Sequence, residues 1–254
     1  MSPPTIYNPA IPFTCRRKPP RRRRITHLTT RVRCGLVCFV QMSHSTVSHV
    51  RSSGALAGPG AVACTAHYDN IRVDDCVSGG VGGGMTLAFA SGSWTNSVVT
   101  NSGAGADGGG MYFSFPPGLK FTLRKLQFLN CFAGRNGGGM IVQGGGSPTM
   151  DNIIIKDSTA TAGGAIYFQS SSPILKNPIV IEGCSATERG GGVYFAGATS
   201  MTGALVVKNS HATTSGGGVV VAGGEVNLVK GTSITGCSSS TGAAPSKCPA
   251  PTRC

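Results

Sequence analysis

The sequence has few charged residues, a single tryptophan and no long apolar run. Charged residues make up 12% of the 254 residues, whereas glycine alone occurs 39 times. This composition does not suit an ordinary helical globule. No stretch approaches the roughly 18 apolar residues of a membrane-spanning helix, and the residues after Met1 lack the basic-then-apolar order of a signal peptide. Short runs of Val, Ile, Phe and Met between Gly, Ser, Thr and Asn instead predict many strands joined by tight turns.

A repeated pattern runs from Val73 to the C-terminal end. Each unit has an apolar residue, two variable residues, a Cys or Ser, one further residue and a small residue. A short spacer, Gly-Gly-(Gly/Ala) and an apolar run follow, as in FLNCFAGRNGGGMIV at 128–142. The Cys/Ser position occurs seven times, at spacings of 26, 29, 27, 26, 26 and 27 residues. Its members, which we call the Cys/Ser ladder, are Cys76, Ser102, Cys131, Ser158, Cys184, Ser210 and Cys237.

The repeat predicts a solenoid. One unit has a single apolar stripe on each strand and cannot bury it alone, so the units must stack. The period fits a leucine-rich repeat or a wide parallel β-coil, but the Leu and Asn of the leucine-rich pattern are missing. We therefore predict an all-β fold, a parallel β-helix of about seven coils over residues 53–244, with coils about 4.8 Å apart. The glycines are expected at corners, where the backbone takes positive φ.

Cys and Ser alternate along the ladder, which separates the cysteines. Neighbouring ladder cysteines are two coils apart, about 9.6 Å, whereas a disulfide needs Cα atoms within roughly 7 Å. We therefore predict that the four ladder cysteines are buried free thiols. A metal ladder is disfavoured, because the thiolate ligands of one zinc all lie about 2.3 Å from it. The state of the other six is left open: Cys15, Cys34, Cys38, Cys64, Cys248 and Cys254.

The strand after each glycine turn is expected to send its first and third residues inward and the middle residue outward. The predicted inward pairs are Met85/Leu87, Met111/Phe113, Met140/Val142, Ile166/Phe168, Val193/Phe195 and Val219/Val221. The predicted outward column is Thr86, Tyr112, Ile141, Tyr167, Tyr194 and Val220. An outward aromatic stripe suits the docking of a glycan or a host-cell protein, so Tyr112, Ile141, Tyr167 and Tyr194 form a candidate interaction face. Strand propensity alone also favours these residue types there.

The N-terminal segment carries most of the net charge of +13. Residues 1–51 hold ten Lys/Arg and no acid, whereas the remainder holds twelve bases and nine acids. Like charges and prolines oppose a packed core, so residues 1–52 are predicted to be largely disordered, and residues 245–254 to be an unstructured tail. The basic run is Arg16, Arg17, Lys18, Arg21, Arg22, Arg23 and Arg24. It suits an anionic partner, but we prefer the interpretation that it is a solvated tail or a non-native start of the gene model, and no specific nucleic acid is predicted.

The acidic residues do not gather in the pattern. A polysaccharide lyase needs acids around calcium and a base, and a glycoside hydrolase needs a carboxylate pair. Asp75 and Asp157 come closest to a shared column, but they lie three coils apart, roughly 14 Å. His211 has no Ser or Asp partner in its column beyond Ser210, and no Lys-Ser/Thr follows the glycines, as a phosphate loop requires. We therefore predict no catalytic, cofactor-binding or metal-binding residue.

The paired motifs FLNC with GGGMIV and IKDS with GGAIYF resemble those of the polymorphic outer membrane protein repeat, over about Val73 to Ala244. In that family the fourth residue is usually Asn, and here it is Cys or Ser. The resemblance implies a right-handed, pectin-lyase-like β-helix with a role in surface adhesion or antigenic display, at the cell surface or secreted. We expect a non-catalytic interaction protein, and a fragment of a longer one. The alternative is a pectin-active or polysaccharide-active enzyme whose loops supply the acids.

Overall fold

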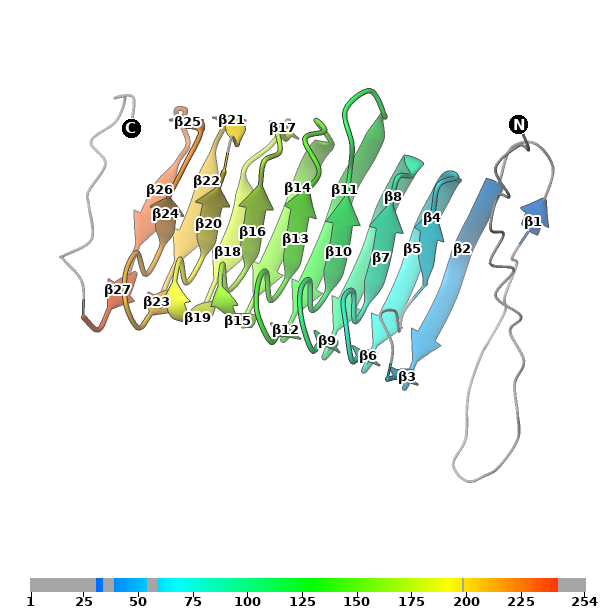
Figure 1. Ribbon diagram of the computed structural model, residues 1–254, viewed down its shortest axis with the longest axis horizontal. Coiled ribbons are helices and arrows are strands. Elements are labelled where there is room, and N and C mark those ends of the chain that lie inside the picture. Colours follow the sequence, from blue (N-terminus) through cyan, green and yellow to red (C-terminus); the bar gives the residue numbers. More distant parts are fainter. Residues whose placement is uncertain (1–30, 34–38, 54–58, 198, 242–254) are drawn as a thin grey trace, which may run out of the picture.

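The computed structural model describes residues 31–33, 39–53, 59–197 and 199–241 (Figure 1). Throughout these residues the chain forms strands and turns, with no α-helix. Equivalent strands of successive coils pair in parallel, and the coils stack along one axis, with β2 at one end of the stack and β27 at the other (Figure 1). The fold is therefore the predicted parallel β-helix, with about eight turns rather than seven.

The longest strands form sheet A, a twelve-stranded sheet along one side of the coils. From the sixth coil onward its strand is divided into two short pieces. Its strands are β1 (Arg31–Arg33), β2 (Phe39–Ser48), β5 (Thr65–Asp74), β8 (Ser91–Thr100), β11 (Phe121–Leu129), β14 (Thr149–Lys156), β17 (Ile174–Leu175), β18 (Ile179–Glu182), β21 (Ser200–Gly203), β22 (Leu205–Lys208), β25 (Glu225–Leu228) and β26 (Ser233–Thr235). Only β1 pairs antiparallel, with β2, among the described pairs of this sheet.

Two further sheets complete each coil. Sheet B follows the Cys/Ser ladder and has eight short strands: β3 (Arg51–Ser52), β6 (Val77–Ser78), β9 (Gly103–Ala104), β12 (Phe132–Ala133), β15 (Thr159–Ala162), β19 (Ser185–Arg189), β23 (His211–Ala212) and β27 (Ser238–Ser239). Sheet C has seven: β4 (Gly60–Val62), β7 (Met85–Ala88), β10 (Met111–Ser114), β13 (Met140–Gln143), β16 (Ile166–Gln169), β20 (Val193–Ala196) and β24 (Val219–Val221).

The β-helix begins before residue 53. Strand β2 pairs in parallel register with β5, and β3 pairs with β6, which places Val50 in the ladder one coil before Cys76. Residues 39–52, which were expected to be largely disordered, therefore belong to the first coil, together with β4. The repeat pattern missed this coil because Val stands where Cys or Ser is expected and no glycine triplet follows. The basic run and residues 245–254 lie outside the described residues.

The core lies between the three sheets, and the predicted inward pairs fill it. All ten inward residues of β7, β10, β13, β16 and β20 are fully buried. Phe168 and Phe195 stack on each other in successive coils, with ring centroids 5.1 Å apart. The last pair differs, because Val219 is only partly buried and Val221 is 41% exposed. Strand β24 is the last of sheet C, so no described strand covers it.

Two corners of the second to seventh coils have a left-handed backbone. Gly137 opens a glycine triplet at φ +66°, and a Cβ there would lie 2.2 Å from the Met140 carbonyl oxygen. The other corner is the residue just before each ladder member, where Asn and Asp tolerate positive φ. Its members with positive φ are His49, Asp75, Asn101, Asn130, Asp157, Gly183, Asn209 and Gly236. This position of the repeat, which we treated as variable, therefore has a conformational requirement.

Candidate interaction face

The residues predicted to form an interaction face lie in one column of sheet C. Parallel pairing of β10, β13, β16 and β20 aligns Tyr112 with Ile141, Ile141 with Tyr167, and Tyr167 with Tyr194. Their neighbours in each strand point into the core and are buried. Alternation along the strands therefore directs all four side chains to the outer side of the sheet, one per coil.

Tyr167 and Tyr194 form a stacked pair within this column. Their ring centroids are 5.2 Å apart, the planes differ by 7°, and both side chains are partly exposed. Each ring thus covers one face of the other, and both side chains retain some exposure to solvent. Burial, followed by the neighbouring Tyr194, raises the pKa of Tyr167. Both features indicate that the two rings pack against each other and are partly shielded from water.

Ile141 does not contribute to the accessible face. It is 1% exposed, although the register places it in the outward column. The Tyr112 hydroxyl accepts a hydrogen bond from Gln143 Nε2 at 2.6 Å, so the Tyr112 ring extends toward the coil that holds Ile141. Thr86, at the start of the column, is also buried. The accessible aromatic residues of this column are therefore Tyr112, Tyr167 and Tyr194. The sequence analysis did not predict that the larger side chains of the column would cover the smaller ones in neighbouring coils.

A second outward column lies beside the tyrosines. Strand pairing aligns Ala88, Ser114, Gln143, Gln169 and Ala196 in successive coils. We use the name tyrosine face for the polar and aromatic members of both columns: Tyr112, Ser114, Gln143, Tyr167, Gln169 and Tyr194. The seven described strands of sheet C contain no charged residue. The tyrosine face is therefore an uncharged surface rich in hydroxyl and amide groups.

Charged residues lie at the corner that precedes this face, among them an ion pair. Asp107 Oδ2 lies 2.8 Å from Arg135 Nη2. Its other oxygen accepts hydrogen bonds from the backbone and the side-chain nitrogen of Asn136, at 3.2 and 3.0 Å. Burial, followed by the charge of Asp107, raises the pKa of Tyr112. Because Asp107 is already paired, this corner adds little net charge to the tyrosine face.

The outer surface of sheet A, unlike that of sheet C, carries charged side chains on its strands. Lys156 Nζ lies 2.7 Å from Glu182 Oε2, and Lys208 is the next residue in the same column. The hydrogen bond and charge of Lys156 lower the pKa of Glu182. Sheet A therefore carries alternating charges along its outer side, whereas sheet C carries none on its strands.

The Cys/Ser ladder is a structural element. Cys76, Cys131 and Cys184 are buried, and all four ladder cysteines are free thiols, as predicted. Cys237 is only partly buried, because it lies in the last described coil. Burial raises the pKa of both Cys131 and Cys184 to about 12. Such thiols remain protonated at neutral pH and are poor nucleophiles.

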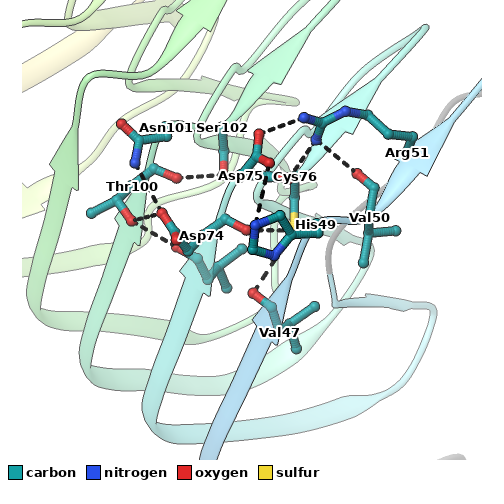
Figure 2. Close-up of polar contacts among 11 residues, drawn as sticks. Val47, His49, Val50, Arg51, Asp74, Asp75, Cys76, Thr100, Asn101 and Ser102 are labelled. Carbon is teal, nitrogen blue, oxygen red and sulfur yellow. Dashed lines mark hydrogen bonds and ion pairs between the residues drawn. The ribbon is translucent and has the colours of Figure 1, made fainter. Parts of the chain in front are cut away.

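A charged cluster joins the first coils on the edge of the ladder (Figure 2). Asp75 pairs with Arg51, and its Oδ2 lies 3.8 Å from His49 Nε2. The neighbouring Asp74 accepts hydrogen bonds from Thr100 Oγ1 at 2.6 Å and from Asn101 Nδ2 at 3.0 Å. These contacts connect residues of adjacent coils, so the first coil is attached to the second by charge as well as by strand pairing.

His211 has more partners than the sequence indicated. Its Nδ1 lies 3.0 Å from Ser238 Oγ, and its Nε2 lies 3.2 Å from Ser240 Oγ. The expectation that it lacks a column partner beyond Ser210 is therefore wrong, because both hydroxyls come from the next coil. Asp75 and Asp157 do share a column, in the corner before the ladder, but three coils separate them.

Two absences concern the described residues. In this part of the chain no three His, Cys, Asp or Glu side chains lie close enough together to hold a metal ion. None of its elements is a helix of the length and hydrophobicity needed to cross a membrane. The chain matches no protein-family model, no curated protein and no solved structure.

Proposed function

We propose that the protein is a non-catalytic β-helix that binds a partner at a cell surface through the tyrosine face. The observation that carries this proposal is the stacked, partly exposed pair of Tyr167 and Tyr194 on the outer side of sheet C. Tyrosines are favoured in interfaces because a ring provides apolar contact and a hydroxyl at low entropic cost. The repeat motifs support an assignment to the polymorphic outer membrane protein type, with a surface or secreted location.

The geometry of the sheet favours binding over catalysis. Outward side chains of successive coils lie at the spacing of the strands, about 4.8 Å, which gives a regular array of hydroxyl and amide groups along the axis. Such an array suits an extended partner, since contacts add along the axis without any loop rearrangement. A catalytic centre instead requires different groups that converge on one reacting atom.

The experiment is a cell-binding assay with the purified, fluorescently labelled protein. The double variant Tyr167→Ala/Tyr194→Ala removes the aromatic pair, and Val180→Ala/Val206→Ala removes two partly buried outward residues from sheet A as a matched control. We expect the wild-type protein and the control variant to bind the cells saturably, and the tyrosine variant to lose this binding. Circular dichroism shows whether both variants are folded. Equal binding by the tyrosine variant would refute the proposal. Release of uronates from pectin by the wild-type protein would support the enzyme alternative instead.

A further inference from the structure

We propose that the ligand of the tyrosine face is a neutral saccharide chain that lies along the axis of the β-helix. This inference rests on the proposed function and names the ligand class for the same site. Its basis is the segregation of charge between the outer surfaces of sheets A and C, together with the hydrogen-bonding groups that sheet C presents.

The lack of charge on sheet C selects against ionic ligands. The chain has a net charge of +13, and sheet A displays Asp74, Lys156, Glu182 and Lys208 on its outer side. The described strands of sheet C display no charged residue. A uronate carboxylate or a charged peptide side chain would lose hydration on this face without gaining an opposite charge, which is unfavourable. A neutral ligand incurs no such cost.

The groups on the face match the chemistry of sugar hydroxyls. A tyrosine hydroxyl donates and accepts, and a glutamine amide offers two donors and an acceptor. Gln143 uses one donor for Tyr112, which orients its amide and leaves its remaining groups available. The Tyr167 and Tyr194 rings are fixed by mutual stacking. One face of each of these two rings is covered by the other ring. We therefore expect contact with the saccharide through hydroxyls and ring edges more than through stacking on ring faces.

The spacing of these groups suits a chain rather than a single sugar. Hydroxyl or amide groups recur in four consecutive coils, from β10 to β20, and they align in two parallel columns. Each coil advances about 4.8 Å along the axis. A linear saccharide along this direction would place successive units opposite successive coils, with a hydroxyl or amide group available at each one. The two columns therefore form a linear, uncharged binding surface that runs parallel to the axis of the β-helix.

The test uses isothermal titration calorimetry on the full-length protein. The probes are neutral oligosaccharides of glucose, galactose, mannose, xylose and N-acetylglucosamine, with polygalacturonate as the acidic comparison. The variant Tyr167→Phe/Tyr194→Phe removes two hydroxyls but retains the rings. Thr122→Val removes an outward hydroxyl from β11 of sheet A as the control. At about 1 kcal/mol for each of the two hydrogen bonds, we expect the double variant to bind a neutral probe roughly 30-fold more weakly and the control to bind as wild type.

The outcomes separate this inference from the proposed function. The inference would be overturned if no neutral probe binds. It would also be overturned if polygalacturonate binds as tightly as the best neutral probe. Neutral binding that the Phe variant leaves unchanged would also overturn it. If cell binding still depends on Tyr167 and Tyr194 in those cases, the proposed function stands with a different ligand. If cell binding is independent of both tyrosines, the proposed function itself fails.

Discussion

The hydroxyl of Ser158 accepts a hydrogen bond from the backbone N–H of Cys131, one coil earlier, at 3.3 Å. The same hydroxyl donates to the Lys156 carbonyl at 3.0 Å. Ser102 makes the equivalent pair of contacts with the N–H of Cys76 and the Thr100 carbonyl. A serine in the ladder thus satisfies a backbone donor of the preceding coil, which gives a physical reason for serines between the cysteines.

Removal of a ladder hydroxyl should weaken the β-helix. Ser158→Ala leaves the buried N–H of Cys131 without this acceptor, and an unsatisfied buried donor costs about 1 to 3 kcal/mol. We expect a loss of that size in the free energy of unfolding, measured by urea denaturation. Thr159→Ala, at the exposed position next to it, is the control and should stay within about 0.5 kcal/mol of wild type. Equal stability of Ser158→Ala would argue against this role of the ladder.

The ladder cysteines should differ in reactivity. At pH 8 an alkylating reagent should modify the partly buried Cys237 faster than Cys131 and Cys184, which are buried and have a pKa raised to about 12. Labelling rates followed by mass spectrometry measure this order. Rapid native labelling of Cys131 would contradict the burial of the ladder.

The raised thiol pKa values also predict a loss of stability at alkaline pH. The unfolded chain releases the thiol protons near the ordinary value of 9.0, whereas the folded chain retains them until about pH 12. The unfolded state therefore gains relative stability as the pH rises above 9. We expect urea midpoints that fall between pH 8 and pH 10, and a smaller fall in Cys131→Ala/Cys184→Ala, measured relative to the stability of each protein at pH 8.

Two glycine substitutions should separate backbone strain from steric overlap. Gly118→Ala introduces a Cβ at φ +87° with no atom within 4 Å, so only the strain of about 1 to 3 kcal/mol applies. Gly137→Ala adds a contact of 2.2 Å with the Met140 carbonyl oxygen to a similar strain. Thermal unfolding should show a clearly larger loss for Gly137→Ala. Equal losses would indicate that the glycine corner is less tightly packed than the structure shows.

The first coils should become less stable in acid. Hydrogen bonds from Thr95 and Asn96 lower the pKa of Asp69, and the hydrogen bond from Thr100 lowers that of Asp74. A lowered carboxyl pKa contributes stability that is present above the ordinary value of 3.8 and is lost as the pH falls through the folded-state value. Asp69→Asn/Asp74→Asn should therefore flatten the fall in stability below about pH 4, measured by urea denaturation across pH. An unchanged pH profile would contradict this assignment.

The sequence predicted the features that repeat and missed those that depend on neighbouring coils. The period and the alternation of apolar residues predicted the β-helix and the buried pair Ile166/Phe168. Burial of Ile141 depends on the size of side chains one coil away, and the partners of His211 come from the next coil. Neither relationship is visible until the register between coils is known. Val50 was missed because its side chain fits the ladder position without matching the Cys/Ser pattern.

The measurement that tests the central claim most directly is site-specific photocrosslinking on cells. A benzophenone amino acid replaces Gln169, on the tyrosine face, or Thr122, on the outer side of sheet A. If the protein binds its partner through sheet C, irradiation should link position 169 to a cell-surface component and leave position 122 unlinked. Crosslinks from position 122 alone, or equally from both positions, would contradict a binding role for the tyrosine face.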